Sequence, residues 1–184
     1  IDAGAIAADY LRSAGATLDS VVLTHYHEDH ANGVSQLLER VPVDAIAFPA
    51  AAEESPLKGA ILSAAEEKQI ALYEIGEDRT VTLEGESLRL FAPLGAGETN
   101  EEGLSVLATS GDFDVLITGD MGGDVEQLLL EHTELPHVEL LVAGHHGSDT
   151  STTAELLEAV RPKVAVISVG LDNRYGHPAA GTLE

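Results

Sequence analysis

Hydrophobic residues along the chain fall into short runs rich in β-branched side chains and into longer stretches with helical spacing. The short runs predict strands, and apolar residues three and four positions apart predict amphipathic helices. The expected strands are Val21–Thr24, Ile46–Phe48, Val81–Leu83, Ser87–Phe91, Ser105–Thr109, Val115–Thr118, Leu140–Ala143 and Val164–Val169. The expected helices are Ala5–Ser13, Gly33–Val41, Leu57–Gln69, Val125–His132 and Thr153–Val160.

Several of these strands are apolar on both faces, which indicates burial between two layers. The segment "VTLEGESLRLF" predicts a β-hairpin that turns at Glu84–Gly85–Glu86. The segment "APLGAGETNEEG", Ala92–Gly103, has neither a helical nor a strand pattern, and a loop of this length in a compact domain is often functional. Helices mixed with strands, some of them antiparallel, predict a layered α/β fold.

The length of 184 residues fits one domain, which we expect to span residues 1–184. No apolar run approaches the ~18 residues that a membrane-spanning helix needs. The chain begins at Ile1 rather than Met and stops at "GTLE", where a helical pattern begins. We therefore expect a fragment of a longer protein, whose other parts could include a signal peptide, a lipid anchor or membrane helices.

The formal net charge is −23, from 32 acidic and 9 basic residues. Such self-repulsion is screened at high salt, so the composition favours a salt-loving source over an ordinary acidic protein. The charge opposes a polyanionic partner but does not exclude one, because a metal site supplies local positive charge. The chain has no cysteine, so a metal would be held by histidine and carboxylate side chains.

Ligand-type side chains follow the ends of several apolar strands, in "VVLTHYHEDH", "VLITGD" and "LLVAGHH", and a fourth strand leads into "NRYGHP". Residues at strand ends are held by a rigid sheet and can converge on one edge. His25 and His27 are two positions apart, so they can point to the same side of an extended segment. Asp29 and His30 continue the pattern as the chain enters a helix, and a chance surface cluster is a weaker interpretation of this spacing.

Asp120 and the pair His145 and His146 share this position after a strand. A lone aspartate there is often a turn or cap residue, but the shared context favours a metal ligand for Asp120 and for at least one histidine of the pair. His132 and His137 lie beside a helix end and a loop, and we interpret both as non-functional. Imidazole with carboxylate suits zinc or manganese, and iron is also compatible.

The motifs "THYHEDH", "TGD" and "GHHGS" resemble the metallo-β-lactamase fold. The resemblance is closer to the ComEC-like branch, the nuclease-like domain associated with DNA uptake. It is carried by "LDSVVLTHYHEDHANG", "LLVAGHHGSDTSTT" and "ISVGLDNRYGHP". It implies an αββα sandwich, two mixed β-sheets flanked by helices, with two divalent metal ions.

The resemblance also implies a ligand for each metal position. His25 and His27 would hold one ion and Asp120 would bridge, while the other ion would take Asp29, His30 and His145. His145 fits the last position better than His146 because it directly follows the strand and its glycine, although the two roles could be exchanged.

In one respect the sequence departs from many family members, which carry a further histidine ligand in the loop before the bridging aspartate. Here the corresponding region, "APLGAGETNEEGLS", has no histidine, and Asn100 and Ser105 are the polar residues expected to substitute for it.

The expected function is a metal-dependent phosphodiesterase or nuclease in which a metal-bridged hydroxide attacks the substrate. Asp29 would orient the nucleophile, and His146 or His177 would protonate the leaving group. The segment "GSDTST" offers the hydroxyls of Ser148, Thr150 and Ser151 before a helix start that suits a phosphate, or that simply forms a helix cap. Asn173 and Tyr175 could contact substrate or make the turn that carries His177.

Two other functions remain open from the sequence. One is hydrolysis of a small ester, lactone or phosphocholine-type diester, and the other is a non-catalytic binding module with a vestigial site. The low aromatic content, 4%, offers little for stacking bases and argues against tight single-strand binding. The resemblance implies DNA as one candidate substrate, an extracellular or outward-facing location, and a membrane-embedded parent or partner. Nothing in the sequence indicates an oligomer.

Overall fold

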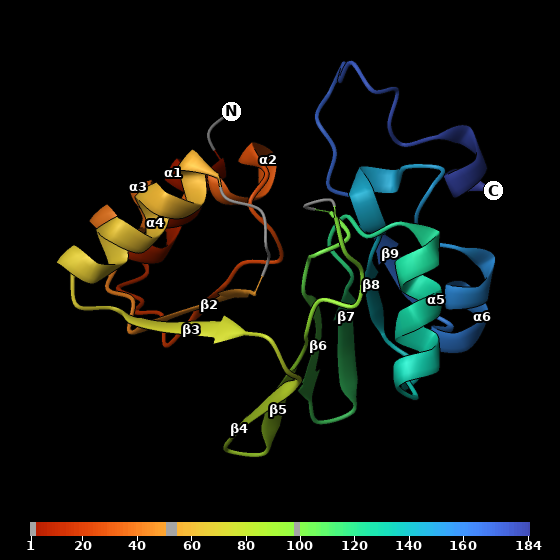
Figure 1. Ribbon diagram of the computed structural model, residues 1–184, viewed down its shortest axis with the longest axis horizontal. Helices are drawn as coiled ribbons and strands as arrows, with labels where there is room; N and C mark the ends of the chain where they lie inside the picture. Colours follow the sequence, from red (N-terminus) through yellow and green to blue (C-terminus); the bar gives the residue numbers. More distant parts are fainter. Residues whose placement is uncertain (1–2, 51–54, 98–99) are drawn as a thin grey trace.

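The computed structural model describes residues 3–50, 55–97 and 100–184. The first layer contains a parallel sheet of three strands in the order β1 (Val21–Val22), β2 (Ala45–Pro49) and β3 (Ala71–Ile75). Its helices, on the side away from the second sheet (Figure 1), are α1 (Ala3–Ser13), α3 (Val34–Arg40) and α4 (Pro56–Glu67). The short helix α2 (Glu28–Ala31) lies at one end of this layer.

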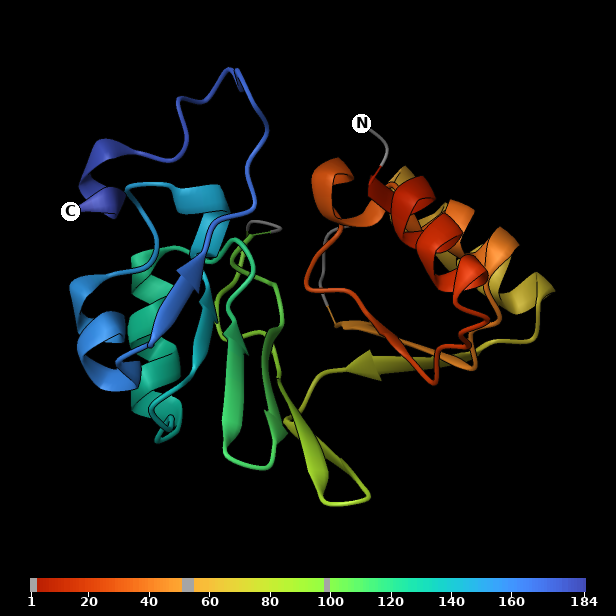
Figure 2. The same cartoon turned by 180° about the vertical axis from the view of Figure 1, so that it is seen from behind.

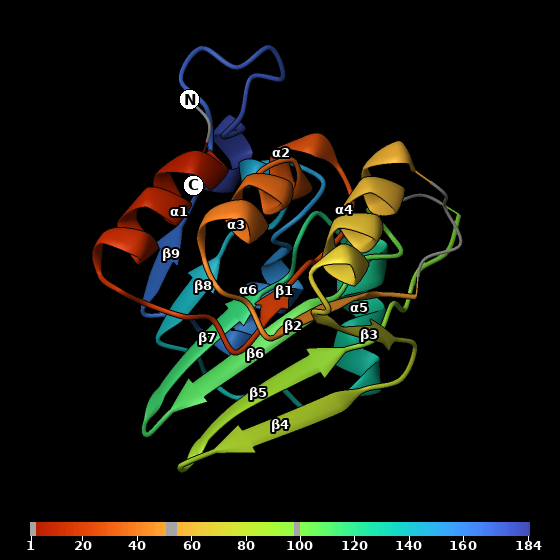
Figure 3. The ribbon, with the colours of Figure 1, turned by 90° about the vertical axis from the view of Figure 1, so that its left-hand side faces the viewer.

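The second layer contains a mixed sheet of six strands in sequence order, which Figure 3 shows side by side. The strands are β4 (Arg79–Leu83), β5 (Glu86–Phe91), β6 (Ser105–Ser110), β7 (Phe113–Ile117), β8 (Leu140–Val142) and β9 (Val164–Val166). Neighbours from β4 to β7 are antiparallel, and β7, β8 and β9 are parallel. The helices of this layer are α5 (Gly123–His132) and α6 (Ala154–Val160).

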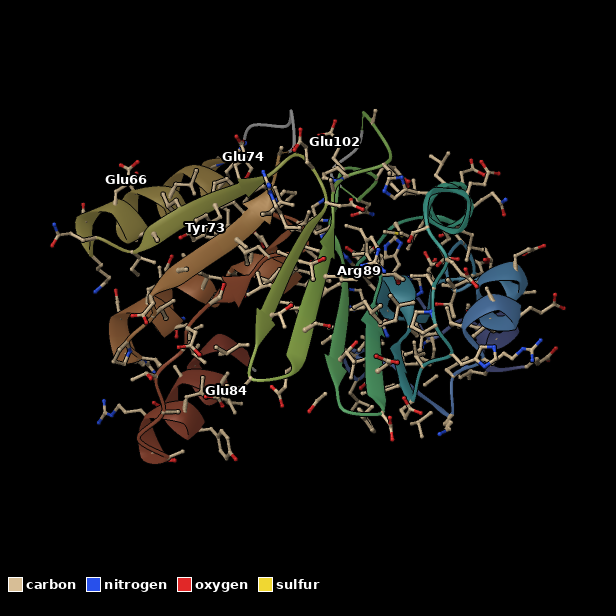
Figure 4. All side chains as sticks on the ribbon, turned by 90° about the horizontal axis from the view of Figure 1, so that it is seen from below. Glu66, Tyr73, Glu74, Glu84, Arg89 and Glu102 are labelled. Atoms are coloured by element: carbon tan, nitrogen blue, oxygen red, sulfur yellow. The ribbon has the colours of Figure 1, made fainter. Side chains whose placement is uncertain are left out.

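Three clusters of buried side chains hold the layers together. One joins the small sheet to α3 and α4 around Ile46 and Ile61, and a second joins the large sheet to α5 and α6 around Leu116 and Leu129. The third lies between the sheets, where Ala47 and Ile75 of the small sheet meet Leu90 and Val106 of the large one. This order of helices, sheet, sheet and helices confirms the expected αββα sandwich, and Figure 4 shows the two sheets between the helices from below.

Most of the expected elements are confirmed, including the hairpin, whose turn residues Glu84 and Gly85 have φ values of 52° and 92°. The prediction omitted β3. Its sequence, "ALYEI", is interrupted by Glu74 and only Ile75 of its five residues is buried, although its backbone pairs with β2 throughout. The first strand is shorter than expected, and the last ends at Val166 rather than Val169.

Two long segments without helix or strand contribute residues to the site. The loop expected at Ala92–Gly103 has neither helix nor strand where it is described, and residues 98–99 fall outside the described residues. After β9 the chain forms a long excursion, seen from behind in Figure 2, that ends in a 3₁₀ turn at Ala180–Leu183. Across the described ranges, the helices are too short or too polar to cross a membrane.

Candidate metal centre

The predicted ligand residues come together at one edge of the two layers. His25 and His27 lie between β1 and α2, while Asp29 and His30 lie in α2. Asp120 follows β7, and the histidine pair follows its parallel neighbour β8 in the turn Gly144–Gly147. Because parallel strands place their carboxyl ends at the same edge, the residues after β7 and β8 meet there. Figure 1 shows α2 and the turn after β8 at this edge, on opposite layers.

Two groups of three side chains bring their potential ligand atoms within 4.8 Å of one another. The first group contains His25, His27 and Asp120, and the second contains Asp29, His30 and His146. The groups touch, because His30 Nε2 lies 3.2 Å from Asp120 Oδ1. Imidazole and carboxylate donors of this kind suit divalent transition metals.

The carboxylate of Asp120 lies at the centre of the cluster and is only 4% exposed. Burial alone would raise its pKa, but His25 and His30 outweigh that effect and hold the pKa of Asp120 well below its usual range. The cause is the close approach of the two ring nitrogens, which lie 3.6 Å (His25) and 3.2 Å (His30) from the carboxylate oxygens and favour its ionised form. Asp120 therefore carries a negative charge in a buried position, which favours a cation at this point.

The buried ring of His25 fits a metal ligand. Its Nδ1 lies 3.2 Å from the hydroxyl of Thr24, and its buried Nε2 has no hydrogen-bond partner in the described structure, with Asp120 Oδ2 3.6 Å away. Burial lowers the pKa of His25, so the ring is neutral near pH 7. A buried nitrogen without a partner is costly, and a bound cation would satisfy it.

His146, rather than His145, lies with Asp29 and His30. Its Nε2 is 3.2 Å from Asp29 Oδ2 and 3.0 Å from His30 Nε2, while its Nδ1 donates to the carbonyl of Ser168 at 2.7 Å. A ligating histidine usually donates its other ring N–H to a carbonyl or carboxylate in this way, with the remaining nitrogen directed at the metal. The sequence interpretation that preferred His145 for this place differs from the structure.

The backbone conformation of the turn explains why His146, rather than His145, lies beside Asp29 and His30. His145 and His146 adopt left-handed conformations, with φ values of 47° and 56°. The direction of the strand therefore does not continue into the turn, and the first histidine is aimed elsewhere. His145 Nε2 lies 4.0 Å from Asp120 Oδ2, and its ring centre is 5.7 Å from that of His177.

An open cavity of about 400 Å³ adjoins the cluster. Its lining includes both histidines of the turn and, from the segment after β9, Tyr175 and His177. Tyr175 and His177 stack with their ring centres 5.9 Å apart. Asn173 stabilises this segment, because its side-chain amide forms hydrogen bonds with the backbone of Gly170, Tyr175 and His177. Tyr175 and His177 thus face the cavity, and Asn173 shapes the turn that presents them.

In the hydroxyl-rich segment after the histidine turn, the three expected substrate-binding residues have different surroundings. Ser151 donates to the carbonyl of Met121 at 2.8 Å, and the Ser148 hydroxyl is buried beside the Thr150 hydroxyl. Of these three residues, Thr150 lines a cavity with Asp120 and His145, one of about 480 Å³.

The start of α6 is already filled by a carboxylate of the protein. Glu126, fully buried in α5, accepts the N–H groups of Thr152 at 2.6 Å and Thr153 at 2.8 Å. Thr153 also caps the helix through its side chain. The helix cap, one of the two interpretations, is therefore present, and the N–H groups of Thr152 and Thr153 already have a protein acceptor. Glu126 could not be recognised from the sequence, since a glutamate within a helical pattern is usually an ordinary surface residue.

The model of the metallo-β-lactamase superfamily matches residues 2–170, so the chain belongs to that superfamily, whose fold is that of a metal-dependent hydrolase. Among solved structures, CmlA, a diiron β-hydroxylase from Streptomyces venezuelae, aligns with a TM-score of 0.61 at 16% identity. The alignment covers 88% of this chain and 40% of CmlA, and this likeness concerns the fold alone.

Curated relatives confirm the expected ComEC-like branch. ComE operon protein 3 of Bacillus subtilis is 28% identical over 91% of this chain and 22% of its own length. Recombination protein 2 of Haemophilus influenzae is 29% identical over 95% of this chain and 21% of its own length. The competence protein ComA of Neisseria gonorrhoeae is also 29% identical. The chain thus spans about a fifth of the length of these relatives.

Proposed function

We propose that this domain is a metal-dependent phosphodiesterase that cleaves nucleic acid. The observation that carries the proposal is the setting of the buried Asp120 carboxylate, which lies within 4.0 Å of ring nitrogens from four histidines. Such a concentration of imidazole and carboxylate donors has little value for stability unless a cation is bound, because each desolvated polar atom is costly. The cluster therefore supports catalysis with metal rather than a structural network.

The two groups of ligand atoms supply two ion positions. His25 and His27 would hold one ion and Asp29 with His30 the other, and Asp120 lies where it can reach both. We propose His146 as the further ligand of the second position, because its Nε2 faces Asp29 and its Nδ1 is bonded to the backbone. Zinc and manganese fit this donor set best, and iron is compatible with it.

Two divalent ions would lower the pKa of water towards neutrality and offset the charge that develops on a phosphate. The side chains around the two ion positions have different roles in the proposed reaction. Asp29, 60% exposed at the cavity, accepts a hydrogen bond from the attacking water and so orients it. His177 lines the same cavity and donates a proton to the leaving oxygen. Tyr175 and Thr150 border the cavities where substrate would lie.

The names of the relatives, competence and recombination proteins, support nucleic acid over a small diester as the substrate. The same resemblance supports an outward-facing position at the cell membrane and a larger, membrane-embedded parent protein. With a net charge of −23, the domain would need bound cations or high salt to accept a polyanion. This need is consistent with a salt-loving source.

The test begins with the domain purified in high salt and its bound metal measured. Hydrolysis of bis-p-nitrophenyl phosphate and of single-stranded DNA is then compared among the wild type, Asp120→Asn and Asp112→Asn. Asp112 is exposed in the turn between β6 and β7, so its substitution matches the charge change away from the site. We expect metal-dependent hydrolysis of both substrates, a loss of at least about 100-fold for Asp120→Asn, and no loss for Asp112→Asn.

Other results would contradict the proposal in distinct ways. Hydrolysis of the small diester alone would indicate a small-molecule phosphodiesterase. Hydrolysis of an ester or lactone, with neither diester cleaved, would indicate the other class of hydrolase. Wild-type protein that binds no metal and turns over none of these substrates would be a binding module.

A further inference from the structure

The side chain of Asn100 ends in a buried carbonyl oxygen without a hydrogen-bond partner among the described residues. A buried acceptor in this state costs about 1–3 kcal/mol, so it calls for an explanation such as an ion or water. Asn100 lines both cavities beside the cluster, together with Asp120 and His145. Its unsatisfied oxygen is therefore in the right part of the molecule to meet a cation.

The backbone fixes the segment of Asn100 against the first metal motif. The N–H of Leu104 donates to the carbonyl of Thr24, next to His25, at 2.8 Å. Gly103 makes this approach possible, because a Cβ there would lie 3.2 Å from the Asn100 carbonyl and 3.3 Å from the Thr24 carbonyl. Asn100 is thus held beside the ligand motif by a backbone bond and by close packing.

The first group of ligand atoms has a place for one more donor. It contains the side chains of His25, His27 and Asp120, whereas zinc sites usually have four ligands and manganese sites more. Ser105 is the other polar residue of this segment, but its hydroxyl donates to the sulfur of Met121 at 3.7 Å. Of the two substitutes that the sequence offers, Asn100 is the one with an unused donor atom.

We propose that Asn100 binds the ion of the first group through its amide oxygen, beside His25, His27 and Asp120. An oxygen ligand is harder than an imidazole nitrogen, so it shifts the preference of this position towards manganese. The inference rests on the metal positions of the proposed function, but not on turnover or on any substrate.

The experiment is a titration of metal-free domain with Mn²⁺ in high salt, in which electron paramagnetic resonance reports the free ion. The variants are Asn100→Ala, Asn100→Asp and, as the matched control from the same segment, Ser105→Ala. Circular dichroism confirms that each variant is folded. We expect two bound ions in the wild type and a loss of affinity of about 10- to 100-fold at one position in Asn100→Ala. Asn100→Asp should restore tight binding, and Ser105→Ala should match the wild type.

The inference is overturned if folded Asn100→Ala binds both ions within threefold of the wild-type affinity. It is also overturned if Ser105→Ala weakens binding as much, or if Asn100→Asp fails to restore it, since the segment would then act only through packing. A failure of the proposed phosphodiesterase function would give a different result from a failure of this inference. In that case the variants would show this pattern of metal binding while the wild type cleaved no phosphodiester.

Discussion

The buried carboxylate of Glu126 provides a direct test of how the site is held in place. Glu126 is 0% exposed and accepts two backbone N–H groups, from Thr152 at 2.6 Å and Thr153 at 2.8 Å. The hydroxyl of Thr152 in turn accepts the N–H of Gly144, at the start of the histidine turn. Glu126 is therefore a positioning residue, because it connects α5 to the loop that follows the turn.

The expected loss of stability follows from these bonds. A hydrogen bond to a charged group contributes about 1.5–3 kcal/mol, so Glu126→Ala, which removes two, should lower the free energy of unfolding by about 3–6 kcal/mol. Glu126→Gln keeps one acceptor oxygen but turns an amide N–H towards a backbone N–H, so about half of that loss is expected. Glu131→Gln, on an exposed position of the same helix, should change stability by less than about 0.5 kcal/mol.

The assay is urea unfolding of the metal-free protein at constant high salt, followed by circular dichroism. Metal affinity of the folded Glu126→Gln variant is measured in parallel, and it should fall because the turn carrying His146 loses its support. A loss below about 1 kcal/mol for Glu126→Ala would refute the reasoning, because two partly buried N–H groups would have lost their acceptor. Equal losses for Glu126→Gln and Glu131→Gln would refute it as well.

Three further predictions concern metal, acid and salt. Mn²⁺ at about 100 times its dissociation constant should stabilise the protein by about 2.7 kcal/mol per site, seen as a higher melting temperature that EDTA reverses, and an unchanged melting temperature would contradict binding to the folded state. Acid should destabilise the metal-free protein, because the folded state lowers the pKa values of His25 and Asp120 and the unfolded chain binds more protons. Stability should fall as the pH drops below the ordinary histidine value of 6.5 and again below the ordinary aspartate value of 3.8, and thermal unfolding across this pH range checks the sign. Arg174, whose guanidinium lies 4.9 Å from the centre of the Tyr175 ring, is expected to contact a substrate phosphate. Arg174→Gln should therefore reduce the log–log salt slope of single-stranded DNA binding by about 0.7, whereas Arg161→Gln, on an exposed position after α6, should leave the slope unchanged.

The parts of the fold that the sequence predicted are those with a strong local pattern. Strands β5 to β8 are apolar runs, and the hairpin has a glycine in its turn, so both could be recognised without tertiary information. Strand β3 was not recognised in this way, because three of its five residues are exposed, although its backbone pairs with β2 throughout. Strand β9 ends at Val166, opposite Val142, which is the last residue of its partner β8, so its end depends on a neighbour that lies far away in the sequence.

Within the site, the sequence predicted which side chains lie together where spacing alone determines their geometry. His25 and His27 are two residues apart in an extended segment, and Asp29 and His30 open the next helix, so their convergence is local. Asp120 joins them because it follows a strand of the same sandwich. Glu126 was missed, since nothing near it in the sequence distinguishes a buried acceptor from a surface glutamate. Its burial depends on Thr152 and Thr153, which are 26 and 27 residues further along the chain.

The histidine pair shows most clearly why a ligand cannot be assigned by counting from the end of a strand. A non-glycine residue in the left-handed region costs about 1–2 kcal/mol, and here two adjacent histidines adopt it before Gly147, whose φ is 80°. Gly147 also contacts the segment after β9: its carbonyl accepts the N–H of Ala179 at 2.8 Å, and a Cβ on it would lie 2.8 Å from Pro178. The strained turn is therefore held in place by the same segment that brings His177 to the cavity. That segment lies some thirty residues further along the chain. Tertiary packing therefore decides which of His145 and His146 lies beside Asp29 and His30. The structure had to be known before His146 could be preferred for that position.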